Sequence, residues 1–214
     1  MIAQDRWAGF CDAFLMDEEE PLLALREEAI QAGIPIIRRE TAYFLRWLIQ
    51  VQHPENILEI GTGVGYSALY MLHYAPEDAR LVTIENYERR IPAAEANFAK
   101  AEVKDRVAFL TEDAAMVLPT LGGTYELVFL DAAKAQYITI LPELIRLLGH
   151  GGMLVTDNIA QDGETLSSRY AVRRRDRTIH KRMREYLYAV THDERLLTEL
   201  LPVGDGIAVS VRRA

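Results

Sequence analysis

The stretch Ile57–Tyr66, ILEIGTGVGY, constrains the fold of this chain more than any other part of the sequence. It opens with a short apolar run rich in branched residues, which is typical of a buried parallel strand. Gly61, Gly63 and Gly65 follow at alternate positions, and a segment suited to a helix begins at Tyr66. A strand, a glycine turn and a helix form a nucleotide-binding crossover, because glycine turns tightly and lets a ligand approach the backbone.

The spacing of these glycines distinguishes a dinucleotide-binding site from other cofactor-binding sites. A dinucleotide fold shows G-x-G-x-x-G, whereas this chain has G-x-G-x-G preceded by Glu59. This pattern resembles the first motif of the class I methyltransferases, which bind S-adenosylmethionine. The resemblance implies that the loop passes beneath the amino-acid part of that cofactor. From these residues alone, an ordinary glycine-rich bend between a strand and a helix remains the alternative.

The rest of the chain alternates between strand and helix patterns. Strands are predicted at residues 57–61, 81–85, 107–111, 126–131 and 152–157, and helices at 66–74, 88–101, 114–120, 136–148 and about 170–190. Two closing strands, roughly 195–202 and 206–212, are joined through Gly204-Asp205-Gly206, which favours an antiparallel pair. The alternation predicts an α/β, Rossmann-like three-layer sandwich with seven mostly parallel strands and an antiparallel closing strand.

The N-terminal part of the chain precedes the first strand and is expected to be helical. We predict one domain over residues 1–214, with N-terminal helices in 1–52 and a catalytic α/β core in 53–214. The helices are predicted at residues 2–16, 22–31 and 38–51, the first with Ile2, Trp7, Phe10 and Phe14 as apolar anchors. These helices can cover the cofactor, pair with a second subunit or pack on the sheet, and the sequence leaves the choice open.

Composition limits the cellular compartment and the partners that we expect for this protein. The chain has 214 residues, half of them hydrophobic, and one cysteine, Cys11, so it has no internal disulfide framework. No apolar run approaches the ~20 residues that a membrane helix needs, and no secretory signal is visible. We therefore expect a cytoplasmic protein without a membrane partner. The formal net charge of −8 argues against a general nucleic-acid binder, and no DNA partner is expected.

A local cluster of basic residues departs from this acidic background. Between Arg169 and Arg184 the chain has eight basic residues and one acid, Asp176. The basic residues are Arg169, Arg173, Arg174, Arg175, Arg177, Lys181, Arg182 and Arg184. We place them on the predicted helix 170–190, with Val172, Ile179, Met183, Tyr186 and Val190 near its apolar face. A charged run of this kind is usually a solvated helix face, and phosphate binding is the alternative.

The residues at the carboxyl ends of the predicted strands carry the candidate chemistry, because ligands bind there in an open α/β sheet. Glu85 ends the second strand, twenty residues after Gly65, and suits a bidentate hydrogen bond to ribose hydroxyls. Asp131 ends the fourth strand and Asp157-Asn158 the fifth. Two carboxylates and an amide oxygen on adjacent strands suit Mg²⁺, although each acid alone could be a helix N-cap.

Together these strand ends resemble the cation-dependent O-methyltransferases related to the catechol and caffeoyl-CoA methyltransferases. The resemblance covers about Pro35 to Val211 and is carried by Asp-Ala-Ala-Lys at 131–134 and Thr-Asp-Asn at 156–158. It implies S-adenosylmethionine and a divalent cation as cofactors, and a homodimer. The implied metal ligands are Asp131, Asp157 and Asn158. The implied cofactor residues are Ile37, Glu59, Gly61, Gly63, Tyr66, Ser67, Glu85, Asp113, Ala114 and Asp131. Glu112 stands where that family usually has glycine, which weakens the adenine contact expected of Asp113.

Within that family, the chain most resembles the bacterial tRNA 5-hydroxyuridine methyltransferases. The segments that carry this resemblance are Pro35-Ile36, IGTGVGYSA, LDAAKAQY, TDNIAQDG, the basic helix and the ending LLPVGDGIAVS. The resemblance implies methylation of 5-hydroxyuridine at the tRNA wobble position to 5-methoxyuridine. Asp131 and Lys134 are then the catalytic residues, Lys134 as general base, unless Lys134 only balances charge. The predicted RNA-binding residues are Arg173, Arg174, Arg175, Arg177 and Lys181. The alternatives are a small-molecule catechol or phenolic O-methyltransferase and a non-catalytic RNA-binding module.

Overall fold

The computed structural model describes residues 4–15 and 17–214 of the chain. Within these residues, the centre of the molecule is a seven-stranded sheet with the order β3-β2-β1-β4-β5-β7-β6. The strands are β1 (Asn56–Ile60), β2 (Arg80–Ile84), β3 (Val107–Leu110), β4 (Tyr125–Leu130), β5 (Leu148–Thr156), β6 (Leu196–Leu201) and β7 (Ile207–Arg212). The strands β1 to β5 pair in parallel, and β7 pairs antiparallel with both β5 and β6. The predicted fold class is therefore confirmed.

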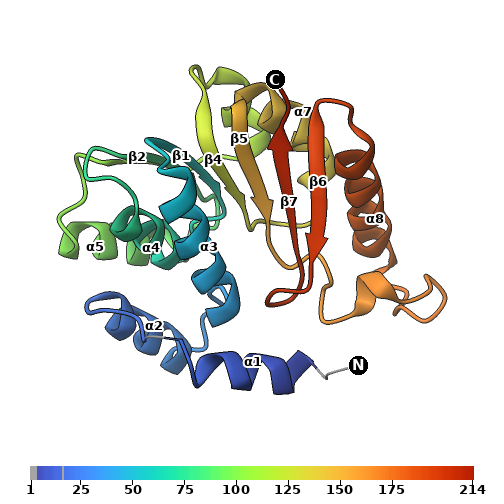
Figure 1. The fold of residues 1–214 in the computed structure, drawn as a ribbon, viewed down its shortest axis with the longest axis horizontal. Helices are drawn as coiled ribbons and strands as arrows, with labels where there is room; N and C mark the ends of the chain where they lie inside the picture. Colours follow the sequence, from blue (N-terminus) through green and yellow to red (C-terminus); the bar gives the residue numbers. More distant parts are fainter. Residues whose placement is uncertain (1–3, 16) are drawn as a thin grey trace.

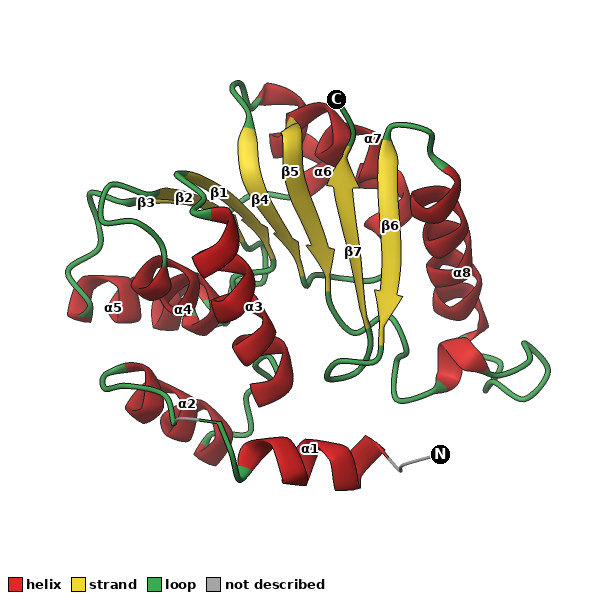
Figure 2. Cartoon of the chain, viewed as in Figure 1, coloured by secondary structure: helices red, strands yellow, loops and turns green. Residues whose placement is uncertain are grey.

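Helices cover both faces of this sheet and make a three-layer arrangement (Figure 2). The chain begins with α1 (Gln4–Asp12) and α2 (Leu22–Gln31), and one face of the sheet has α3 (Arg39–Gln52), α4 (Tyr66–Tyr74) and α5 (Ile91–Lys100). The other face has α6 (Ala114–Val117) with the short 3₁₀ turn η1 (Leu118–Thr120), α7 (Tyr137–Leu147) and α8 (Arg177–His192). A second 3₁₀ turn, η2 (Glu164–Leu166), precedes α8.

The core divides between the two faces because side chains alternate along each strand. Ile57 of β1 joins the cluster that contains α2, α3, α4 and α5. Leu58 and Ile60 of the same strand join the cluster that contains α6, α7 and α8. The central strands are buried on both sides, which explains the continuous apolar runs in their sequences.

The first N-terminal helix ends earlier than the sequence predicts, at Asp12 rather than at residue 16. Ile2 and the side chain of Trp7 lie outside the described part of the structure. Phe10 and Phe14 leave 55% and 74% of their surface exposed, so they do not anchor this helix in the core. In contrast, α3 packs against α4, and its residues Leu45, Leu48 and Ile49 are buried.

The predicted helix 170–190 begins later than expected. Residues 170–176 form turns, and α8 starts at Arg177. Starting at Tyr170 would have placed Arg173, Arg174 and Arg175 near the positive end of the helix dipole, which disfavours cations. These three arginines therefore lie on an exposed segment before α8, and their predicted place on a helix is wrong. Val172 is buried despite lying outside the helix, whereas Ile179 remains 38% exposed.

The carboxyl ends of the parallel strands meet at one edge of the sheet (Figure 1). The helices α1 and α2 lie beyond this edge (Figure 1). The segment between β5 and α8 also extends from this edge, on the side of the molecule where α8 lies (Figure 1). Among the described residues, no helix combines the length and the apolar character needed to span a bilayer. The candidate site residues predicted at the strand ends therefore lie along this edge.

Candidate active site

A cleft of about 510 Å³ opens at the carboxyl ends of β1, β2 and β4. Polar side chains that line it are Glu85, Asn86, Arg90, Glu112, Asp131, Lys134, Gln136 and Asn158. A narrower extension, lined by Ile37, Gly63, Tyr66, Ser67 and Arg90, continues past the glycine loop. The cleft therefore brings together residues that lie as far apart in the sequence as Pro35 and Asn158.

The glycine loop lies close against the end of β4. The backbone N–H of Gly61 donates to the Ile84 carbonyl at 2.9 Å, and the Asp131 N–H donates to the Ile60 carbonyl at 2.9 Å. A Cβ at position 61 would lie 1.9 Å from the Asp131 carbonyl oxygen, and the φ of Gly61 is +103°. Only glycine fits here, because any side chain would collide with the backbone of Asp131. The absence of a side chain at position 61 thus allows Asp131 to lie directly beside the loop.

Glu85 ends β2 and faces the glycine loop across the cleft. Its Oε2 accepts the Gly63 N–H at 2.9 Å, and its Oε1 accepts the Tyr87 N–H at 2.9 Å. Each carboxylate oxygen has capacity for further hydrogen bonds, and the residue lines the cleft. The geometry suits the predicted contact with a pair of ribose hydroxyls.

Glu59 lies beneath the loop and is fully buried. Its Oε1 accepts a hydrogen bond from Ser67 Oγ and its Oε2 one from Thr83 Oγ1, each at 2.5 Å. Burial raises its pKa to about 7, against the lowering effect of these two hydrogen bonds. Both carboxylate oxygens thus face protein groups, and Glu59 is not among the residues that line the cleft. This placement makes it a support for the loop and for the start of α4.

Asp113 occupies the N-cap position of α6, where its Oδ1 accepts the Ala115 N–H at 2.8 Å. Its Oδ2 accepts from Gln136 Nε2 at 3.0 Å and from Asn86 Nδ2 at 3.1 Å. The carboxylate therefore ties together three segments that border the cleft. Its neighbours in sequence, Glu112 and Ala114, line the cleft themselves.

The three predicted metal ligands lie at the ends of β4 and β5. Burial raises the pKa of Asp131, and the cations of Lys134 and Arg90 oppose that rise. Burial also raises the pKa of Asp157 to about 7, helped by the negative charge of Asp131. Asn158 has a φ of +54°, which asparagine tolerates better than most residues, and lines the cleft.

One buried oxygen at this point has an unused hydrogen-bonding position. Asp157 Oδ1 accepts the Asn158 N–H at 2.7 Å and the Thr41 hydroxyl at 3.3 Å. Asp157 Oδ2 is buried and has no partner among the described residues. A buried carboxylate oxygen without a partner is costly, and a divalent cation would satisfy it. Within residues 4–15 and 17–214, no three His, Cys, Asp or Glu side chains cluster as a metal site. The candidate set instead combines two carboxylates with one amide oxygen, and these donors fit Mg²⁺.

Lys134 is half-buried beside this group. Its Nζ donates to Asn158 Oδ1 at 3.4 Å and lies 5.9 Å from the centre of the Tyr137 ring. The Tyr137 hydroxyl accepts the Ala132 N–H at 3.2 Å, which fixes the turn that presents the lysine. The contact with Asn158 places the Lys134 side chain next to the candidate metal ligands.

The sequence prediction missed three supporting residues. Thr41 of α3 bonds Asp157 across 116 residues of chain. Arg90 lines both parts of the cleft. Arg26 of α2 is buried, pairs with Glu18 at 2.8 Å and donates to the Tyr66 hydroxyl at 2.5 Å. Long-range docking brings Thr41 and Arg26 here, and no local pattern signals it.

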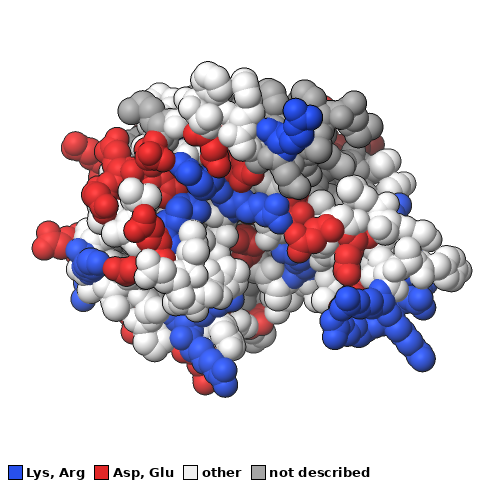
Figure 3. Space-filling view, turned by 90° about the horizontal axis from the view of Figure 1, so that it is seen from below, with Lys and Arg blue, Asp and Glu red and all other residues white. Residues whose placement is uncertain are grey.

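The predicted RNA-binding residues lie to the side of the cleft. Arg173, Arg174 and Arg175 are exposed. Arg177 Nε donates to the Val172 carbonyl at 3.2 Å, and Lys181 pairs with Glu185 at 3.5 Å. Seen from the carboxyl edge, a group of basic side chains projects from the side of the molecule that holds α8 (Figure 3). Acidic side chains gather on the opposite side of this view (Figure 3).

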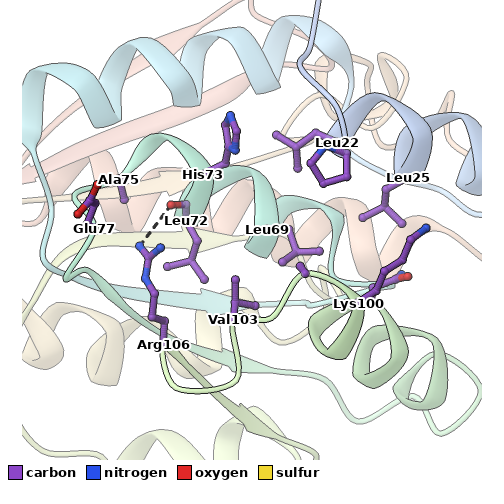
Figure 4. A pocket seen from close by; sticks show the side chains of 13 residues that line it. Leu22, Leu25, Leu69, Leu72, His73, Ala75, Glu77, Lys100, Val103 and Arg106 are labelled. Carbon is purple, nitrogen blue, oxygen red and sulfur yellow. Dashed lines mark hydrogen bonds between the residues drawn. The ribbon is translucent and has the colours of Figure 1, made fainter.

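A second pocket, of about 400 Å³, lies away from the strand ends between α2, α4 and α5 (Figure 4). Leu22, Leu25, Leu69 and Leu72 surround it, and Arg106 closes one side by donating to the Leu72 carbonyl at 3.3 Å. This pocket is mostly apolar and contains none of the predicted site residues. The polar cleft at the strand ends is therefore the candidate active site.

The chain is similar to known O-methyltransferases over most of its length. A family model described as O-methyltransferase matches residues 14–213. A catechol O-methyltransferase from Niastella koreensis is 33% identical over 155 residues, which cover 70% of either chain. Caffeoyl-CoA O-methyltransferase 1 from Arabidopsis thaliana is 32% identical over 91% of this chain and 79% of its own. The SAH-bound structure of the Podospora anserina methyltransferase PaMTH1 superposes with a TM-score of 0.86 at 26% identity, covering 98% of this chain and 95% of that one.

Proposed function

This chain belongs to the O-methyltransferase family, and we propose that it transfers a methyl group from S-adenosylmethionine to a substrate hydroxyl with the help of Mg²⁺ or another divalent cation. The observation that carries the proposal is the unpartnered buried Oδ2 of Asp157 beside Asp131 and Asn158. The glycine loop adjoins these residues through the contact of Gly61 with Asp131. Methyl donor and acceptor would therefore meet across a short distance.

The cofactor residues divide into contacts and supports. Gly61, Gly63 and Ser67 would border the amino-acid part of S-adenosylmethionine, and Glu85 would bind its ribose hydroxyls. Ile37 and Tyr66 would close the narrow extension of the cleft. Glu59 would act by holding Ser67 and Thr83, and Asp113 by holding α6 beside the adenine.

The acceptor hydroxyl is the weak partner, because the methyl sulfonium of the cofactor is already reactive. A bound divalent cation favours the anionic form of a hydroxyl oxygen that it contacts. Asp131, Asp157 and Asn158 would hold that cation, and Lys134 would accept the hydroxyl proton. The rest of the site aligns donor and acceptor, and orientation of this kind contributes up to ~7–11 kcal/mol to catalysis.

We propose 5-hydroxyuridine at the tRNA wobble position as the acceptor, which would become 5-methoxyuridine. Its C5 hydroxyl and C4 carbonyl are neighbouring oxygens and suit chelation of one cation. The exposed Arg173, Arg174 and Arg175 beside the site support an RNA substrate, since guanidinium groups bind phosphates. A loop base is already accessible to an enzyme. Such a substrate would place the enzyme in the cytoplasm.

A small catechol or phenol is the second candidate acceptor. The 33% identity with the catechol O-methyltransferase from Niastella koreensis favours it, and two adjacent hydroxyls chelate a cation as well. A small phenol has no phosphates, however, and makes no use of the projecting arginines. The two candidates therefore differ in their dependence on those side chains.

Reversing the charge of Arg173, Arg174 and Arg175 to glutamate tests the choice. Methyl transfer from labelled S-adenosylmethionine is measured on tRNA that contains 5-hydroxyuridine and, in parallel, on catechol. We expect tRNA methylation to be lost and any catechol methylation to persist. Lys104→Glu, an exposed reversal at the opposite end of the sheet, is the matched control and should retain both. Normal tRNA methylation by the triple variant would show that the arginines are only a solvated surface.

Homodimerisation through the N-terminal helices remains a prediction. The exposed rings of Phe10 and Phe14 contact each other, with their centroids 4.8 Å apart and their planes tilted by 43°. Sedimentation analysis of the wild type and of Phe14→Ser would test it. A monomer at micromolar concentration, or a dimer that Phe14→Ser leaves unchanged, would contradict the prediction.

A further inference from the structure

A hollow of about 590 Å³ lies on the outer side of α8, apart from the cleft at the strand ends. The segment before the helix contributes Ser168 and Arg169, and α8 contributes His180, Lys181, Arg184 and Tyr188. The last three recur at intervals of three and four residues and so share one helix face. The hollow is thus a surface with a fixed arrangement of side chains.

The hollow is positively charged even though it also contains an acid. Arg169 has no hydrogen bond or ion pair among the residues that the structure describes. Arg184 makes a single contact of Nη1 with the Thr165 carbonyl, at 3.3 Å. Lys181 pairs with Glu185, which also lines the hollow, at 3.5 Å. Three cations against one carboxylate leave an excess that suits phosphate groups.

An aromatic ring forms one end of the hollow. The side chain of Tyr188 is 66% exposed. The His192 ring stacks on it with centroids 3.9 Å apart and an angle of 16° between the planes. A ring supported from one side in this way is a platform for a base, because every base has a stacking face.

The wall of the hollow is anchored by a buried histidine. His180 is 3% exposed, and its Nε2 lies 3.1 Å from the Ser167 carbonyl oxygen. Its Nδ1 is buried and has no partner within the described part of the chain. The bond to Ser167 fixes the backbone next to Ser168 and Arg169, so these residues are held against the helix.

The helix that carries the hollow is linked by a hydrogen bond to the loop of the candidate general base. Arg182 of α8 donates through Nη1 to the Ala135 carbonyl at 2.7 Å. Ala135 directly follows Lys134, the candidate general base. The segment that carries Arg169 also continues from Asn158 after β5. The hollow and the cleft therefore lie on connected segments of the protein, although no described residue lines both.

We propose that this hollow binds the RNA next to the target nucleotide, with a phosphate among Arg169, Lys181 and Arg184 and a flanking base stacked on Tyr188. The inference rests on the proposed RNA substrate and extends the contact surface beyond Arg173, Arg174 and Arg175. The combination of cations with a stacked ring favours a nucleotide over a simple anion. Coenzyme A also carries phosphates and a base, so the experiment must separate it from RNA.

Binding of a fluorescently labelled anticodon stem-loop, measured by anisotropy, tests the proposal. Tyr188→Ala is expected to weaken binding about 5- to 150-fold, the usual effect of losing one stacked base. Tyr188→Phe retains the ring and should stay within about twofold of the wild type. Lys181→Ala should make the slope of log affinity against log salt shallower by about 0.7, the value for one phosphate of a single strand. Lys104→Glu should leave both affinity and slope unchanged.

Three outcomes would overturn the proposal, and they differ in what else they overturn. Equal RNA affinity of the wild type and Tyr188→Ala would remove this site and leave the proposed function standing. Unchanged RNA affinity together with weaker binding of coenzyme A by Tyr188→Ala would assign the hollow to coenzyme A. Absence of RNA binding by the wild type at low salt would overturn the proposed tRNA substrate as well. Thermal melts of each variant verify that binding changes do not reflect unfolding.

Discussion

Replacing Glu59 by glutamine should change how stability depends on pH. The folded protein holds the Glu59 proton up to a pKa of about 7, because burial disfavours the charged form, whereas the reference value is 4.5. Between these values the unfolded chain releases the proton before the folded protein does. The free energy of unfolding therefore falls as the pH rises from 4.5 to 7. The stabilising contribution is complete below pH 4.5 and absent above pH 7.

The magnitude follows from the difference between the two pKa values. At about 1.4 kcal/mol per tenfold change in proton affinity, ionising Glu59 in the folded state costs about 3 kcal/mol. Glutamine has nearly the same shape, stays neutral and can still bond Ser67 and Thr83. The Glu59→Gln variant should therefore gain about 3 kcal/mol relative to the wild type between pH 4.5 and pH 8. Titrating groups that do not interact with Glu59 cancel in the comparison, whereas the nearby charges of Asp131 and Glu85 are part of the measured difference.

Urea denaturation followed by circular dichroism measures this difference at several pH values. The reasoning is refuted if the stability gap between Glu59→Gln and the wild type is the same at pH 4.5 and pH 8. The KM for S-adenosylmethionine gives a second test, because both Glu59 oxygens face protein groups. It should change by only a few-fold, and a rise of tenfold or more would instead indicate direct contact with the cofactor.

Three further predictions concern the site and its supports. Asp157→Ala should abolish cation-dependent methyl transfer and the rise in melting temperature on adding Mg²⁺, and full activity of this variant with a chelator present would contradict the metal site. Gly61→Ala should destabilise the fold by more than about 4 kcal/mol in urea, since its Cβ would lie 1.9 Å from the Asp131 carbonyl; wild-type stability would show that the loop can move. Arg26→Met leaves the buried Glu18 carboxylate unpaired and should cost about 3–5 kcal/mol. Adding Glu18→Gln should recover part of that loss, and a double variant no more stable than Arg26→Met would argue against this pairing.

The fold followed from patterns that are local in the sequence. Continuous apolar runs marked the buried strands, and the Gly204-Asp205-Gly206 turn marked the antiparallel pair of β6 and β7. The positions of Asp131 and Asp157 were predictable because parallel strands bring their carboxyl ends to one edge. The resemblance to a known family then supplied the cofactor and the expected role of each residue.

The features that the sequence did not predict depend on packing between segments far apart in the chain, or on side chains that can serve more than one role. Thr41 reaches Asp157 only because α3 docks beside β5, and no sequence pattern near position 41 predicts this contact. Arg173 and its neighbours were placed on a helix because periodicity ignores the dipole at a helix start. Asp113 resembled a ligand contact in sequence, yet its carboxylate caps α6 and holds Gln136.

Nucleoside mass spectrometry of tRNA tests the central claim most directly. Total tRNA is digested and analysed from a strain that lacks the gene, from its parent, and from the deletion strain complemented with wild type or Asp157→Ala. We expect 5-methoxyuridine to disappear and 5-hydroxyuridine to accumulate in the deletion strain, and only the wild-type gene to restore the methylated nucleoside. An unchanged nucleoside profile in the deletion strain would contradict the tRNA substrate and favour a small phenolic acceptor.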